Sequence, residues 1–223
     1  MQPAITTSIG EKKFDEAREL AYQTSKFSTL MMLIFAIPLI IEIDYILKLW
    51  LINPPQFAVE FCQAILIATV LLKLGWGHHI AICAMGRIAV VQMVLGITAS
   101  LSLAFLLFLI WLGFGAVSIG YSLILTFFIM TIERILFAKK LVKMSIRYWL
   151  VKIFLPVAFT SVLTFVLIKA VILILHPSVW RVLATTILSV CTFSILSWFV
   201  VLTHDERCFI KRNVICRVKN VFG

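Results

Sequence analysis

Six long apolar stretches, separated by short polar loops, constrain this chain more than any other feature of its sequence. Crossing about 30 Å of hydrocarbon takes about 20 mostly apolar residues, and each stretch reaches that length. The runs are continuous and lack the period-two alternation of a membrane β-barrel, so the fold class is all-α. We therefore predict an integral membrane helical bundle of six transmembrane helices, spanning residues 27–47, 57–76, 88–112, 116–138, 148–175 and 179–203.

Composition excludes the alternative that these stretches form the core of a soluble domain. Hydrophobic residues make up 62% of the 223 residues and charged residues only 13%. A soluble domain has about half and about a quarter, respectively. A chain of this size has too little interior to bury so many apolar side chains, so most of them must face lipid.

The formal charge of +10 is explained by membrane orientation. Both ends of the chain and the loops on the same side carry nearly all the Lys and Arg residues, while the opposite loops hold only Lys48 and Arg181. Basic residues favour the cytoplasmic side, so both termini are predicted to be cytoplasmic. Because the positive charge is divided among separate loops, nucleic-acid binding is not predicted.

The predicted spans divide the chain into a cytoplasmic lead-in segment, a six-helix transmembrane domain and a basic cytoplasmic tail, at residues 1–26, 27–203 and 204–223. Within the lead-in, residues 11–26 have the pattern of a short amphipathic helix. That helix either lies on the inner membrane surface or is a solvated connection between two spans.

Charged side chains at membrane depth are costly, so they are the first candidates for function. Glu42 and Asp44 close the first span, and Glu60 lies just inside the second. Each could bind a proton or sodium ion in a coupled transport cycle. Alternatively, all three lie in the outer headgroup layer, paired with Lys48 or solvated.

Three longer basic side chains are interpreted as reaching the headgroups from span ends by snorkelling, namely Lys73, Arg134 and Lys169. Pro38 interrupts the first span and removes one backbone hydrogen bond, which predicts a helix kink. Transporters use such kinks where backbone lines a cavity, although packing alone also produces them.

No enzyme is predicted, because the chain has no Gly-rich phosphate loop, no GxSxG motif and no paired acids on a soluble domain. The adjacent His78 and His79 project about 100° apart on a helix, which disfavours joint metal ligation. The five cysteines show no CxxC spacing. Neither a metal site nor a disulfide framework nor a cofactor is therefore predicted.

The order of motifs in the first 92 residues resembles the later part of bacterial polysaccharide and O-antigen flippases, relatives of the MATE drug exporters. The turn before the third span is similar to that family's ATGK-like turn, with Met85 in place of the usual Thr and Arg87 in place of the usual Lys. The other residues that carry the resemblance are Pro3, Ile5, Thr6, Gly10, Ser25, Lys26, Ser28, Pro38, Glu42, Ile46, Leu49, Trp50, Leu51, Pro54, Pro55 and Gln92.

The resemblance implies transport of an undecaprenyl-diphosphate-linked oligosaccharide, an O-antigen or capsule repeat used in polysaccharide and lipopolysaccharide synthesis, across the bacterial cell (inner) membrane. A diphosphate and a hydrated glycan cannot cross hydrocarbon unaided, whereas a cavity with a few cations can hold the anionic headgroup. The expected substrate-binding residues are Arg87 and Lys73, near the cytoplasmic face, with Gln92. Arg87 is also explained as an ordinary positive-inside loop residue.

Such flippases have two related bundles around a cavity, and the six predicted spans correspond to the last six helices of a MATE-like flippase. The missing N-terminal bundle, or self-association, is therefore an expected partner besides membrane lipid and the lipid-linked oligosaccharide. Without a partner, a cavity-facing surface would expose the small polar residues Ser118, Ser122 and Thr126 to lipid. Two alternatives remain open: part of a MATE-type cation-coupled drug antiporter, and a nonfunctional fragment or membrane scaffold.

Overall fold

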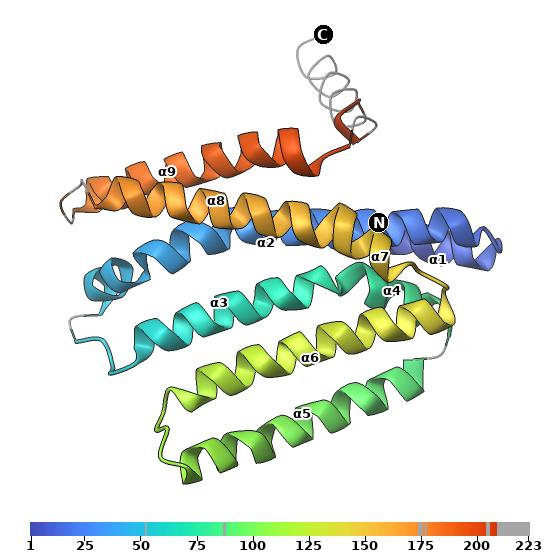
Figure 1. The fold of residues 1–223 in the computed structure, drawn as a ribbon, viewed down its shortest axis with the longest axis horizontal. Helices are drawn as coiled ribbons and strands as arrows, with labels where there is room; N and C mark the ends of the chain where they lie inside the picture. The colour runs from blue at the N-terminus through green and yellow to red at the C-terminus, as the bar shows by residue number, and fades with distance from the viewer. Residues whose placement is uncertain (52, 87, 174–175, 177, 204–205, 209–223) are drawn as a thin grey trace.

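Every regular element of the computed structural model is helical within the residues it describes, which are 1–223 except 52, 87, 174–175, 177, 204–205 and 209–223 (Figure 1). The elements are α1 (Gln2–Gly10), α2 (Phe14–Trp50), α3 (Ala58–Leu74), α4 (Trp76–Ala84), α5 (Ile88–Trp111), α6 (Ser118–Leu141), α7 (Ile146–Trp149), η1 (Leu150–Phe154), α8 (Leu155–Ile172), α9 (Val179–Leu196) and η2 (Ser197–Val201). The two η elements are single π-helical turns that continue their neighbouring helices.

The helices confirm the predicted apolar spans. Five are long and apolar enough to cross a membrane, and a sixth is obtained if α3 and α4, which meet at a bend of 46°, form one span. α7, η1 and α8 together form one such helix, Ile146–Ile172. Its widened turn directly precedes Pro156, whose ring would clash with the carbonyl four residues earlier in a regular α-helix.

α2 is much longer than a membrane span requires. Its 37 residues extend about 55 Å, against about 30 Å of hydrocarbon. Residues 14–26 are therefore the first turns of the helix that forms the first span, and the prediction of a separate short helix over residues 11–26 was wrong. Asp15 and Glu16 lie in the first turn, where acids favour the helix dipole. Pro38 lies inside the helix, which changes direction along its length in Figure 1.

The helices form an open layer in which α2 is central. In the view of Figure 1 the long helices follow one another in the order α9, α8, α2, α3, α6 and α5. The contacts agree from α2 through α3 and α6 to α5, whereas α8 and α9 both pack against α2 and against each other. α5 lies at one edge beside α6, and only 6% of its most apolar stretch is buried. An edge helix of this kind has most of its circumference available for lipid or for another protein surface.

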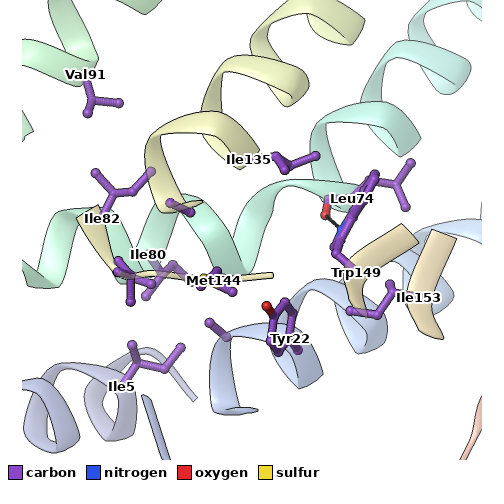
Figure 2. Close-up of a cluster of buried hydrophobic side chains, with 14 of the residues drawn as sticks. Ile5, Tyr22, Leu74, Ile80, Ile82, Val91, Ile135, Met144, Trp149 and Ile153 are labelled. Atoms are coloured by element: carbon purple, nitrogen blue, oxygen red, sulfur yellow. Dashed lines mark hydrogen bonds between the residues drawn. The ribbon is translucent and has the colours of Figure 1, made fainter. Parts of the chain in front are cut away.

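Two apolar clusters hold the layer together, and they include successive stretches of α2. The first gathers side chains of α1, α4, α6 and α7 around Tyr22, and Figure 2 shows Ile5, Ile80, Ile135 and Trp149 in it. The indole of Trp149 donates a hydrogen bond to the carbonyl of Leu74 (3.3 Å), the last residue of α3. The second cluster packs α2 against α8 and α9 around the buried Phe193.

The small polar residues of α6 are packed inside the chain. Ser118, Ser122 and Thr126 are all buried, so the prediction that they face lipid without a partner bundle was wrong. The hydroxyl of Ser122 donates to the carbonyl of Ser102 in α5 (3.1 Å), and that of Thr126 donates to the carbonyl of Ser122 (2.7 Å). Small residues allow α6 to approach α3 and α5 closely.

The α2–α4 contact depends on a glycine. A Cβ atom added to Gly77 would clash with the backbone carbonyl of Ala21, and its amide donates to the Ser25 hydroxyl (3.0 Å). We predict that Gly77→Ala separates α2 from α4 and costs about 1–3 kcal/mol of stability, because backbone cannot move aside as a flexible side chain can. Thermal unfolding of the detergent-purified protein measures this effect.

Gly96→Ala is the matched control, because Gly96 is also inside a helix but a Cβ atom there meets nothing within 4 Å. Alanine favours a helix interior over glycine, so this variant should melt at or slightly above the wild-type temperature. Equal melting temperatures for the two variants would contradict the proposed close approach.

Candidate functional site

Glu42 is the most deeply buried acid of the described residues, with 2% of its surface exposed. It lies in α2 and faces α9, where Nη2 of Arg181 donates to its Oε2 at 2.8 Å. The Thr185 hydroxyl, one helical turn further along, lies 3.1 Å from Oε1. The Arg181 guanidinium also lies 5.7 Å from the ring centre of Tyr45. Glu42 is thus neutralised inside the protein by one charge and one hydroxyl.

The interpretation that places Glu42 in the headgroup layer, solvated or paired with Lys48, does not describe this side chain. Its partner is 139 residues away in the sequence. The sequence does contain one trace of the arrangement, because Arg181 and Thr185 are four residues apart and therefore share a helix face. Nothing in that spacing indicates that Glu42 faces it.

Asp44 and Glu60 occupy different surroundings from Glu42. Asp44 is exposed and forms an ion pair with Lys48 at 2.8 Å, as predicted by the interpretation that places it in the headgroup layer. Glu60 is exposed in the first turn of α3 and lines a groove of about 190 Å³ between α3 and α6, beside Gln63 and Tyr121. The three acids therefore do not form one site in this structure.

The predicted substrate-binding residues lie on different helices. The Lys73 ammonium lies 4.8 Å from the ring centre of Trp76, at the junction of α3 and α4. Gln92 lies on the exposed side of α5. Arg87 lies outside the described residues. No hydrogen bond joins Lys73 and Gln92 in the described part of the chain.

Arg134 was missed as a candidate, because snorkelling explained it without a site. The structure buries it against the α3–α4 junction, with 8% of its surface exposed, so the snorkelling interpretation was wrong for this residue. Its Nε and Nη1 atoms are buried and have no hydrogen-bond partner among the described residues. Glu133, the preceding residue in α6, forms no hydrogen bond with Arg134 and accepts one from Thr98 of α5 through Oε1, while its buried Oε2 has no partner among the described residues.

The two adjacent histidines have separate environments. His78 is buried next to Ser25, with Nδ1 3.4 Å from its hydroxyl, and meets the rings of Tyr22 and Trp149 edge-on. His79 faces Trp76 (ring centres 5.6 Å apart), and its Nε2 lies 3.7 Å from the Cys83 sulfur. This divergence follows from their adjacent positions on one helix.

A second buried ion pair fixes the end of the membrane domain. The Lys26 ammonium contacts both carboxylate oxygens of Glu206 at 2.9 Å, and the side chains are 7% and 8% exposed. Glu206 also accepts a hydrogen bond from the backbone of Thr203 at 2.8 Å. The start of the predicted tail is therefore held against α2.

The charges also differ between the two ends of the layer. Basic residues at the end where α1, α4 and α7 lie include Lys12, Lys13, Arg18, Lys26, Lys139, Lys140, Lys143, Arg147 and Lys152, and those at the opposite end are Lys48, Lys169 and Arg181 (Figure 1).

The long apolar helices and their loops define the class, a multi-pass α-helical membrane protein. No protein-family model, no curated protein and no solved structure matches the chain.

We predict that Glu42 and Arg181 are strongly coupled. Glu42→Leu or Arg181→Leu leaves one buried charge unpaired and should cost about 3–5 kcal/mol, whereas the double variant removes both charges and should be more stable than either single variant. A double-mutant cycle of thermal stability in detergent measures the coupling. The control is the same cycle with Asp44→Asn and Lys48→Met, an exposed pair worth about 0–1 kcal/mol. Additive losses at Glu42 and Arg181 would show that the pair is not coupled.

Proposed function

We propose that this chain is the C-terminal half of a membrane transporter that flips a lipid-linked oligosaccharide with an anionic diphosphate headgroup. The observation that carries the proposal is the distribution of charge partners. Glu42 and Glu206, the buried acids, are each bound by a basic side chain, whereas Nε and Nη1 of the buried Arg134 have no hydrogen-bond partner and Arg134 forms no salt bridge within the described residues. An unneutralised cation suits an anionic substrate.

The same distribution disfavours Glu42 and Asp44 as the coupling acids of the alternative, a MATE-type antiporter. A cation-coupled antiporter needs an acid inside the membrane that is free to bind a proton or sodium ion. Glu42 is bound by Arg181 and Thr185, and Asp44 by Lys48. Glu60 has no ion pair among the described residues but is exposed near the start of α3, which leaves Glu133 of α6, whose Oε2 is buried without a partner, as the candidate for that alternative.

The proposal includes an orientation. The basic end, where α1, α4 and α7 lie, is assigned to the cytoplasm and the loops beyond Lys48 and Arg181 to the outer side of a bacterial inner membrane. Both termini are then cytoplasmic. Substrate would enter at the end where the basic residues are concentrated, which is the leaflet in which lipid-linked intermediates would be taken up.

The open layer supports the need for a second bundle. α5 is almost entirely uncovered, and Gln92 is an amide on its exposed side. Alternating access requires one bundle to move against another around a shared site, and this single layer can form only one side of such a site. The other side is supplied by a separate N-terminal bundle or by a second copy of the chain.

Complementation tests this function. The chain is expressed with and without a co-expressed first bundle from a polysaccharide flippase, in a strain lacking its own, and surface polysaccharide is measured. We expect restoration only when the first bundle is present, because the chain alone forms an open layer. Restoration by the chain alone would mean that a second copy forms the other side of the transport site. Failure to restore surface polysaccharide both with and without the first bundle would overturn the flippase proposal. Glu42→Gln should keep most of the restored activity, whereas an antiporter that uses Glu42 would lose it.

A further inference from the structure

We propose that Arg134 and His79 form a binding site for a phosphate group at the junction of α3, α4 and α6. The site is defined by hydrogen-bond donors that have no acceptor in the described part of the chain. It would take the phosphate of a lipid headgroup or a free phosphate, because the two share the same chemistry. The link to the lipid-linked substrate rests on the proposed function, whereas phosphate binding itself does not.

The first step is the state of the guanidinium. Arginine carries five N–H donors and stays charged in proteins. Arg134 is more than nine-tenths buried, and its Nε and Nη1 atoms have no partner. The side chain lies beside Gly75, since a Cβ atom there would be in ordinary contact with the Arg134 Cδ at 3.6 Å. Buried guanidinium nitrogens without acceptors are unfavourable, so an external anion would supply hydrogen-bond acceptors that the described residues do not.

The second step is the histidine beside it. His79 and Cys83 lie in α4, which packs against α6, the helix of Arg134, and the positive charge of Arg134 acts on both side chains. Nδ1 of His79 is buried and also has no partner. If the Cys83 thiol donates to Nε2, the ring proton is on Nδ1, which makes Nδ1 another donor without an acceptor. Arginine and a neighbouring N–H group together match the several acceptor oxygens of a phosphate.

The third step is the position of the site. Arg134 lies seven residues before the end of α6 at Leu141, or about 10 Å from that end. This is the basic end of the layer, where Lys139 and Lys140 form the last turn of α6. Lys73 adds a positive charge over Trp76, whose ring neighbours His79. A phosphate at headgroup depth is therefore drawn toward the site by charge that lies nearby.

Glu133 forms no hydrogen bond with the guanidinium, although its charge acts on Arg134. It lies on a different face of α6, where its Oε1 accepts from Thr98 beside the groove between α5 and α6. Successive helical residues project about 100° apart, so Glu133 faces α5 when Arg134 faces the α3–α4 junction. Within the described residues, Nε and Nη1 of Arg134 therefore still lack a hydrogen-bond acceptor.

Titration of the full-length, detergent-purified protein with inorganic pyrophosphate tests the site. Binding is measured by calorimetry and by the rise in melting temperature, against chloride at constant ionic strength. We expect saturable binding to wild type and at least about a tenfold loss of affinity in Arg134→Met, because two or more charge-assisted hydrogen bonds are removed. Arg147→Met is the matched control, since Arg147 is exposed at the same end, and it should bind as wild type does.

Folding is checked without ligand. Removing an unpaired buried charge should leave the melting temperature of Arg134→Met equal to or above that of wild type, so lost binding is not lost structure. A second arm uses nanodiscs of phosphatidylcholine with and without phosphatidic acid. Stabilisation by phosphatidic acid that requires Arg134, without a response to pyrophosphate, assigns the site to lipid headgroups, and the opposite pattern assigns it to free phosphate.

Equal responses of wild type, Arg134→Met and Arg147→Met to both probes would overturn the proposal, as would no response of wild type to either probe. The outcome is independent of complementation. Arg134-dependent binding together with failed complementation would keep the site and reject the flippase. Successful complementation without Arg134-dependent binding would reject the site alone.

Discussion

The packing of α2 on both of its sides holds this structure together. α3 and α4 pack against α2, as do α8 and α9, and both apolar clusters include side chains of α2. The approach of α4 depends on Gly77, which lets its backbone reach the carbonyl of Ala21. On the other side, Glu42 joins α2 to α9 through Arg181. Besides α2, the helix Ile146–Ile172 also links the two clusters, through Trp149 and Ile153 in the first and Val157 in the second.

Hydrocarbon provides no hydrogen bonds, and this explains how polar residues are placed within the spans. Many hydroxyls donate to the carbonyl one turn earlier in their own helix, as Thr29, Thr126 and Thr164 do. Two buried acids, Glu42 and Glu206, are paired with basic side chains from distant parts of the chain. Arg134 differs from Lys26 and Arg181, because two of its buried nitrogens lack a hydrogen-bond partner and it forms no salt bridge within the described residues. Those unpartnered donors are the basis of the proposed phosphate site.

Sequence reasoning was most reliable where a local rule determines the structure. The six apolar runs, their order and most of their bounds follow from hydrophobic length, and the Asp44–Lys48 pair follows from a spacing of four residues. It failed where contact between distant helices decides. Residues 11–26 have an amphipathic pattern that is compatible with a surface helix or with the start of a long span, and only the packing of Ala17 and Ala21 distinguishes them. Ser118 and Ser122 were predicted to face a cavity because no sequence pattern shows that α3 and α5 pack against this face of α6.

The sequence by itself determined that the chain is helical, apolar and suited to cross a membrane several times, because each span satisfies its own backbone within about 20 residues. Its basic loops also indicated which end would be cytoplasmic. Only the tertiary structure decided which charges are neutralised. Whether Glu42 meets Lys48 or Arg181, and whether Arg134 reaches headgroups or lies under Gly75, depends on how helices far apart in the sequence pack. The energy of a buried charge is set by those neighbours, which no local pattern contains.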